Sequence, residues 1–275
     1  MRVESRHNER LREVARLIAS SRDRRKSGLC VLEGVHLVDV YLARIGVPET
    51  LVVVDDAMAR NEVRALASRI PEARIITVSR RRFDDIATLP PDVAVLAVVA
   101  TPKPALPPPA DFCLLLENVQ DPGNVGSIIR TAAAAGVQQV LLSRHCAFAW
   151  SPKVLRAAQG AHFLTTIVED VEFAPWIDAF RALGGRTLAA VVGNAGVVYA
   201  ARLQGRIAFV IGSEGQGVSQ ALRERVDECV TIPMASGNES LNAAAAAAVV
   251  LFEAVRQRRN AGAADARPAS LVPRP

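Results

Sequence analysis

Short apolar runs alternate with amphipathic stretches along most of the chain, which is the pattern of an α/β protein. In the first hundred residues, apolar runs predict strands over 29–33, 51–55, 74–78 and 93–99. Helical spacing predicts helices over 4–19, 35–43, 57–68 and 81–87. These elements indicate a small N-terminal α/β domain over residues 1–100.

A proline-rich segment follows this domain. Residues 101–110 contain five prolines, which make a chain stiff and extended and keep it out of a sheet interior. We therefore predict a linker over 101–110, a second domain over 111–259 and a disordered tail over 260–275. The strands predicted in the second domain cover residues 112–117, 139–142, 163–167, 187–192, 207–211 and 229–232.

The first helix predicted in the second domain carries a candidate substrate contact. This helix runs from about Asn124, its expected N-cap, to Ala135, with Gly136 as its expected C-terminal stop, and it places Gly126 and Ser127 one turn before Arg130. Small residues beside a long cation leave room for a substrate, although an exposed arginine in a surface ion pair fits equally well. Further helices are expected from Ser151–Pro152 and over 175–183.

The last predicted helix spans residues 241–258 and is rich in alanine. Its apolar residues repeat at alternating spacings of four and three, which predicts a narrow seam for packing against another helix, either within the subunit or across a dimer. The seam consists of Leu241, Ala245, Ala248, Phe252 and Val255.

Two loops late in the chain are the strongest candidates for a ligand site. One follows the strand that ends at Ile211, and the other follows the strand that ends at Ile232. The carboxyl ends of parallel strands share one edge of a sheet, and open α/β sheets bind ligands there. The polar side chains available in these loops include Glu214, Asn238, Glu239, Ser240 and Asn242.

Positive charge is concentrated near the N-terminus. Residues 1–26 contain nine basic and four acidic residues, and this excess equals the formal charge of +5 of the whole chain. Together with a second cluster at 80–82, it favours a nucleic-acid partner, although a solvated helical face would explain either cluster alone. The candidate RNA contacts are Arg22, Arg24, Arg25, Lys26, Arg80 and Arg81.

Several familiar chemistries do not fit. The order of glycines from Gly212 to Gly217 is not that of a dinucleotide-binding loop, and there is no Walker motif. The four histidines have no metal-ligand spacing, so we expect no metal. The four scattered cysteines indicate reduced thiols, the charged N-terminus argues against a signal peptide, and no apolar run has membrane-spanning length. A cytoplasmic protein is expected.

Three ordered motifs resemble those of the SpoU (TrmH-like) family of RNA 2′-O-methyltransferases. They are residues 121–126 with Arg130, residues 211–217, and residues 232–234 with 240–242. The resemblance covers roughly residues 112–258. More loosely, Leu32-Glu33-Gly34 in its arginine-rich setting resembles the substrate-binding domain that many family members carry.

The resemblance implies a doubly wound α/β domain whose C-terminal segment threads a loop to form a deep trefoil knot. It also implies a homodimer through the C-terminal domain and S-adenosylmethionine bound in the knot. The residues implied to hold the cofactor are Gly193, Ile211, Gly212, Ile232, Met234 and Leu241. Arg130 would contact the attacking oxygen or its phosphate, acting as a base in the stronger version. Asn124, Glu214, Ser240 and Asn242 would orient the reactants.

The sequence leaves open alternative roles for these residues and alternative functions for the protein. Taken singly, Asn124 and Ser240 could be helix caps, and Glu214 a loop carboxylate. The expected activity is ribose methylation of RNA, with ribosomal RNA favoured over transfer RNA. A non-catalytic RNA-binding protein with the same fold and a nucleotide-dependent oxidoreductase are the competing hypotheses.

Overall fold

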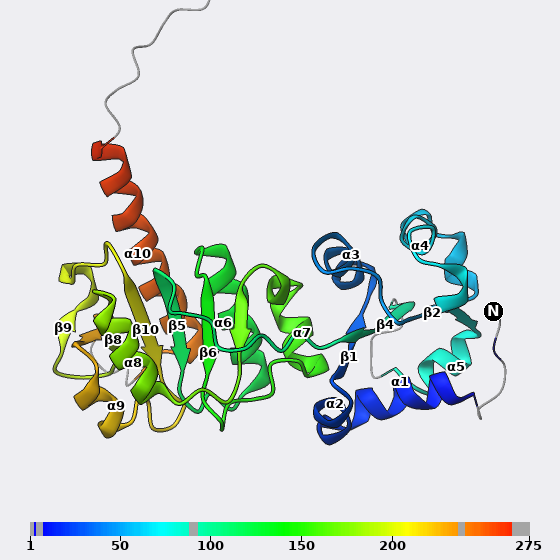
Figure 1. The fold of residues 1–275 in the computed structure, drawn as a ribbon, viewed down its shortest axis with the longest axis horizontal. Coiled ribbons are helices and arrows are strands. Elements are labelled where there is room, and N and C mark those ends of the chain that lie inside the picture. The colour runs from blue at the N-terminus through cyan, green and yellow to red at the C-terminus, as the bar shows by residue number, and fades with distance from the viewer. Residues whose placement is uncertain (1–2, 4–7, 88–92, 236–239, 266–275) are drawn as a thin grey trace, which may run out of the picture.

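The protein forms two lobes, each built around one β-sheet (Figure 1). The structure is a computed structural model that describes residue 3 and residues 8–87, 93–235 and 240–265, with side chains described up to residue 260. The N-terminal sheet has the strand order β1-β4-β2-β3, in which β2 and β3 are parallel and β4 is antiparallel to both its neighbours. Its strands are β1 (Leu29–Glu33), β2 (Thr50–Val54), β3 (Ile75–Val78) and β4 (Val95–Ala100).

The helices of the N-terminal lobe follow the predicted alternation with several differences. The predicted helix 57–68 is divided into a 3-10 turn over Asp56–Ala59 and a helix over Asn61–Ala67, and the helix predicted over 81–87 spans Arg80–Asp84. The first helix begins at Glu9, after the N-cap Asn8, and the predicted residues 4–7 lie outside the described residues. Ser20 then ends α1 and caps a separate short helix that the pattern did not predict. The helices are α1 (Glu9–Ala19), α2 (Ser21–Ser27), α3 (Val35–Arg44), α4 (Asn61–Ala67) and α5 (Arg80–Asp84), with 3-10 turns η1 (Asp56–Ala59) and η2 (Glu72–Arg74).

The C-terminal lobe contains a seven-stranded sheet in the order β7-β6-β5-β10-β8-β11-β9, and the strands described there pair in parallel. This confirms the predicted α/β class. The neighbouring strands β5 and β10 lie inside the sheet, with β6 and β7 beyond β5 and with β8, β11 and β9 beyond β10. The strands are β5 (Phe112–Leu116), β6 (Gln139–Leu142), β7 (Thr166–Val168), β8 (Arg186–Ala190), β9 (Gly196–Val197), β10 (Ile207–Ile211) and β11 (Glu228–Thr231).

Helices cover both faces of this sheet because successive strand residues point to opposite sides. Leu114 and Phe209 pack in the same apolar cluster as α6 and α10, whereas Leu115 and Val210 pack with α8 and α9. Helix α6 also contacts α7. The helices are α6 (Pro122–Ala134), α7 (Pro152–Ala158), α8 (Phe173–Ala182), α9 (Gln220–Arg225) and α10 (Ala243–Asp265), with 3-10 turns η3 (Ala161–Phe163) and η4 (Val198–Ala200).

The structure corrects several predicted boundaries. Helix α6 starts at Pro122 because the Asp121 side chain, not Asn124, caps it by accepting a hydrogen bond from the Asn124 backbone N at 2.8 Å. The predicted strand 163–167 is replaced by η3 and the later strand β7, and β9 was not predicted. Helix α10 continues to Asp265, so the first part of the expected tail is helical, and 266–275 lie outside the described residues.

The predicted seam of α10 is largely on its outer side. Leu241, just before the helix, and Phe252 are 37% and 48% exposed, and Ala245 is exposed as well. The face that packs inside the subunit is formed instead by Ala243, Ala247, Val250, Leu251 and Ala254. Val255, by contrast, packs against the core, so the predicted repeat is divided between the subunit interior and its surface.

The two lobes contact each other directly. The Tyr41 ring of α3 meets Phe163 of η3 edge to face, with ring centroids 5.4 Å apart. The carboxylate of Glu33, in the Leu32-Glu33-Gly34 motif, is buried and pairs with Arg156 of α7 at 3.4 Å. Residues 101–110, which contain neither helix nor strand, connect the lobes as an extended segment.

Candidate active site

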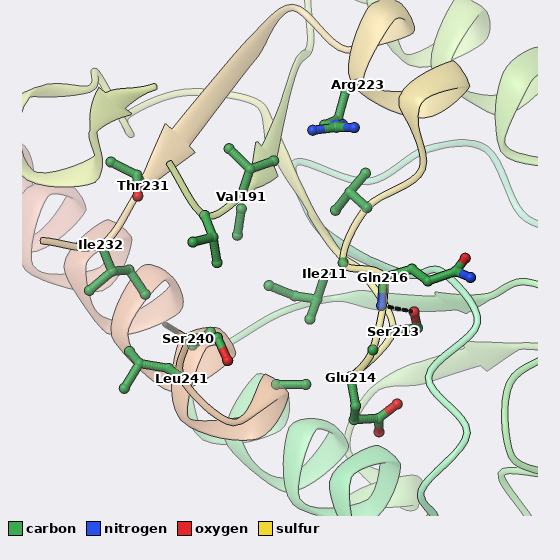
Figure 2. A pocket seen from close by; sticks show the side chains of 18 of the residues that line it. Val191, Ile211, Ser213, Glu214, Gln216, Arg223, Thr231, Ile232, Ser240 and Leu241 are labelled. Atoms are coloured by element: carbon green, nitrogen blue, oxygen red, sulfur yellow. Dashed lines mark hydrogen bonds between the residues drawn. The ribbon is translucent and has the colours of Figure 1, made fainter. Parts of the chain in front are cut away.

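A cavity of about 370 Å³ lies at the carboxyl ends of β8, β10 and β11 (Figure 2). Its walls come from four stretches of chain and from α9. The lining residues are 190–192, 211–218, Arg223, 231, 232, 234, 240, 241, 243 and 246. Because the loops after three parallel strands converge here, residues distant in sequence share one site.

The β10 loop forms a wall made largely of backbone. Ser213 and Gly217 exchange backbone hydrogen bonds of 3.1 and 2.9 Å, which close a tight turn. Gly212 lies directly against that turn, and a Cβ built there would come within 2.0 Å of the Gly217 carbonyl carbon and 2.2 Å of the Val218 nitrogen. Only glycine fits, since no real Cβ tolerates such contacts.

A hydrogen-bonded chain of three side chains joins three separate segments of the chain beside the cavity. The Asn242 amide donates to Asn124 Oδ1 at 2.9 Å, and the Asn124 amide donates to Glu214 Oε1 at 2.8 Å. The Asn242 oxygen in turn accepts from the Ala244 backbone N at 2.9 Å, so Asn242 also caps α10. Three of the five predicted catalytic residues are thus brought together in this Asn242–Asn124–Glu214 network.

The Glu214 carboxylate is held in its ionised form. Burial alone would raise its pKa, but hydrogen bonds from the Asn124 side chain and from the backbone near Gln120 and Asp121 outweigh this and lower the pKa below its ordinary value. The backbone bonds measure 3.4 and 3.3 Å. Glu214 therefore fixes the β5–α6 loop against the β10 loop while staying negative at neutral pH.

The remaining predicted polar residues have different positions. Ser240 lines the cavity, whereas Asn238 and Glu239 lie outside the described residues. Arg130 is exposed on α6, six residues or about 9 Å along the axis from Asn124. It does not line the cavity, and no hydrogen bond or ion pair of its side chain is found in the described part of the chain.

The small residue before Arg130 does not leave room for a substrate. Gly126 is buried against α7, and a Cβ there would come within 2.5 Å of the Ala157 Cβ and 2.6 Å of the Val154 carbonyl oxygen. This glycine is needed for close packing of two helices, which corrects the interpretation from sequence.

Five of the six residues expected to hold the cofactor line the cavity, namely Ile211, Gly212, Ile232, Met234 and Leu241. The sixth, Gly193, is exposed and does not line it, although its neighbour Val192 does. Sequence reasoning missed Val191, Gln216, Thr231 and Arg223. The position of Val191 and Thr231 at or beside strand ends could have identified them, but nothing in the pattern distinguished Arg223 from other surface arginines.

The predicted RNA contacts differ in accessibility. Arg22, Arg25, Lys26 and Arg81 are exposed. Arg24 is 5% exposed, and its guanidinium donates to the carbonyl oxygens of Leu17 and Ile18, so it fastens α2 to α1 and cannot reach a phosphate. Arg80 is half-buried, donates to the Val93 carbonyl at 2.8 Å and lies 3.7 Å from Asp84.

The described residues contain neither a membrane-spanning helix nor a metal-binding group. None of the helices there combines the length and the apolar character needed to cross a bilayer. No group of three or more His, Cys, Asp and Glu side chains in the same residues is arranged to hold a metal ion.

Comparisons with known proteins agree with this geometry. The sequence profile of the SpoU rRNA Methylase family matches residues 111–252, and that of the MRM3-like substrate binding domain matches residues 8–97. The 23S rRNA (guanosine(2553)-2′-O)-methyltransferase RlmP of Bacillus subtilis is 30% identical over 250 residues, which cover 91% of this chain and 97% of that protein.

Solved structures are similar over nearly the whole chain. The SpoU methyltransferase AviRb from Streptomyces viridochromogenes, solved in complex with the cofactor AdoMet, superposes with a TM-score of 0.82 at 29% identity, covering 92% of this chain and 100% of that one. An AdoMet-bound rRNA methyltransferase from Sinorhizobium meliloti gives a TM-score of 0.82 at 25% identity, covering 93% and 97%.

Proposed function

The chain belongs to the SpoU rRNA methylase family, and we propose that it transfers a methyl group from S-adenosylmethionine to a ribose 2′-hydroxyl of ribosomal RNA. The observation that carries the proposal is the Asn242–Asn124–Glu214 network at the rim of the cavity. It joins the three family motifs through side-chain contacts. The folding of any one motif alone would not require these contacts.

The residues around the cavity fit this cofactor. Ile211, Ile232 and Leu241 offer apolar surface for an adenine ring, and Gly212 and Gly217 expose backbone on the β10-loop wall. Backbone groups and Ser240 add polar partners. When bound, S-adenosylmethionine supplies an electrophilic methyl group on a positively charged sulfur.

The protein's own residues align the reactants, and the proton of the 2′-hydroxyl leaves to solvent water. The network fixes the Asn124 and Asn242 side chains, so that donors and acceptors at the rim are oriented before RNA arrives. Correct alignment of two reactants alone lowers the activation free energy by several kcal/mol. Glu214, already ionised and bonded, acts as a positioning carboxylate.

Arg130 is the residue proposed to meet the attacking 2′-oxygen or its adjacent phosphate. A guanidinium stays protonated at neutral pH, so its role is to stabilise developing negative charge on the oxygen. Within one subunit Arg130 lies outside the cavity lining, so we propose that a homodimer completes the site. The exposed seam of α10, with Phe252, is the proposed interface in the C-terminal lobe.

Other features of the proposal rest on family membership. They are the trefoil knot in the C-terminal segment, the division into domains 1–100 and 111–259 with the linker 101–110, and a cytoplasmic location. RNA binding by Arg22, Arg25, Lys26 and Arg81 is supported by their exposure.

Ribosomal RNA is favoured over transfer RNA because relatives that match over most of this chain, such as RlmP, are named for methylation of 23S rRNA. The test is methyl transfer from tritiated S-adenosylmethionine to unmodified ribosomal RNA and to transfer RNA, followed by digestion to nucleosides. We expect label in 2′-O-methylnucleosides of ribosomal RNA. Label in bases, or in no RNA despite cofactor binding, would contradict the proposal, the second result favouring a non-catalytic RNA-binding protein.

A further inference from the structure

Arg223 of α9 is a charged residue of the cavity to which none of the family motifs assigns a role. Figure 2 shows its guanidinium across the cavity from Ser240 and Leu241. Among the described residues that line the cavity it is the one cation, and Glu214 is the one carboxylate.

Neighbouring arginines on the same side of the sheet have acidic partners, but Arg223 does not. Arg225, two residues later on α9, pairs with Asp178, and Arg181 pairs with Asp227 at 2.8 Å. In the described part of the chain, the Arg223 side chain makes no hydrogen bond or ion pair. Glu214 cannot serve it, because that carboxylate is already bound by Asn124 and two backbone N–H groups.

The cavity therefore has three chemically distinct sides. Ile232, Leu241 and Ala246 form an apolar side suited to adenine. Ser240 and the side near Glu214 adjoin the network, where the sulfur and its methyl group must lie for transfer to RNA. Arg223 marks the third side, which is left for the remaining arm of the cofactor, its amino-acid part.

We propose that Arg223 binds the α-carboxylate of the amino-acid part of S-adenosylmethionine. The assignment rests on the proposed function, because it presupposes that this cofactor occupies the cavity. The planar guanidinium offers two parallel N–H donors to a carboxylate, and such charge-assisted pairs are the stronger hydrogen bonds in proteins. The contact holds a part of the cofactor that does not react, so it affects binding more than the chemical step.

The test compares two ligands by isothermal titration calorimetry. S-adenosylhomocysteine carries the amino-acid part, whereas 5′-methylthioadenosine has the same adenosine and a thioether without it. For Arg223→Ala we expect S-adenosylhomocysteine to bind at least tenfold more weakly and methylthioadenosine to bind within twofold of wild type. Arg223→Lys should lose part of the affinity, and Arg225→Ala, on the same helix but paired outside the cavity, should lose none.

Other outcomes overturn the assignment. Equal weakening of both ligands would mean that Arg223 contacts adenosine or shapes the cavity. Unchanged affinity for both, with weaker RNA binding, would make it a phosphate contact. If wild type binds neither ligand, the proposed function itself fails, whereas normal wild-type binding with an unaffected Arg223 variant refutes only the role of Arg223.

Discussion

At the scale of single residues, glycines and asparagines determine the site. Gly212 allows the backbone of the β10 loop to fold onto itself and form the cavity wall. Asn124 and Asn242 then connect that loop to α6 and α10 through their amide groups. Their short side chains have few rotamers to restrict, so the rim is ordered at modest entropic cost.

Gly212→Ala is expected to abolish binding of S-adenosylhomocysteine, because the added Cβ would lie within 2.0 Å of Gly217. The displaced loop would also lower the melting temperature by several degrees. The matched control is Gly196→Ala in β9, outside the cavity lining, because a Cβ at Gly196 meets no atom closer than 3.7 Å. Calorimetric titration and thermal melts of both variants check this prediction, and normal ligand affinity in Gly212→Ala would refute it.

The sequence predicts some of these residue roles and not others. The grouping of Asn124, Glu214 and Asn242 follows from the ordered motifs, and the structure shows their contacts. The role of Gly126 could not be predicted, because its reason is a neighbouring helix distant in sequence. Arg24 lies in a basic cluster typical of an RNA contact, but it is buried. The sequence could not predict this, because only the tertiary arrangement decides which of several adjacent arginines points inward.

At the scale of elements, α10 is unusual in the distribution of its apolar residues. Its apolar and small residues occur on all sides, so that one face packs on α6 and β10 while Ala245 and Phe252 remain exposed. Periodicity identified an apolar seam but could not say whether it packs inside the subunit or across a dimer. A helix with two apolar faces in one chain is typical of an element that also packs against a partner.

Phe252→Arg is expected to weaken the proposed dimer at least tenfold, because a charge would be placed in an apolar interface. The melting temperature of the subunit should change little, since Phe252 is 48% exposed. Leu183→Arg, at a similarly exposed apolar position after α8, is the control. Sedimentation velocity over a concentration series measures the association, and identical behaviour of wild type and Phe252→Arg would exclude this face as the interface.

At the scale of the whole molecule, the two lobes are held as a unit. The Glu33–Arg156 pair, the Tyr41–Phe163 contact and the placement of Arg25 over Phe148 at 4.3 Å join them at several points. Such packing keeps the basic α2 at a fixed position relative to the cavity. The alternation of elements predicted two α/β units, but contacts between the units depend on surface shapes that a one-dimensional pattern does not contain.

Arg22→Gln combined with Lys26→Gln is expected to reduce the salt dependence of RNA binding. Each phosphate contact to a single strand contributes about 0.7 to the slope of log affinity against log salt, so two lost contacts lower the slope by about 1.4. These side chains are exposed, and their replacement leaves the buried Leu11, Val14 and Leu17 of α1 intact. Filter binding across a salt series measures the slope.

The control for this charge prediction is Lys153→Gln, an exposed lysine on α7 outside the basic cluster. It should leave the slope unchanged. If the double variant also keeps the wild-type slope, these two residues of α2 make no phosphate contact, and their charges are simply solvated by water.

The proposed function requires the cavity, the network and Arg130 to act together in methylating a ribose hydroxyl. The decisive measurement is the single-turnover rate of tritiated methyl transfer to ribosomal RNA by wild type and Arg130→Ala, at saturating S-adenosylmethionine. We expect a rate reduced at least 100-fold in Arg130→Ala, with S-adenosylhomocysteine affinity within a few-fold of wild type because Arg130 does not line the cavity. A near-normal rate in Arg130→Ala would rule out the proposed role of this residue.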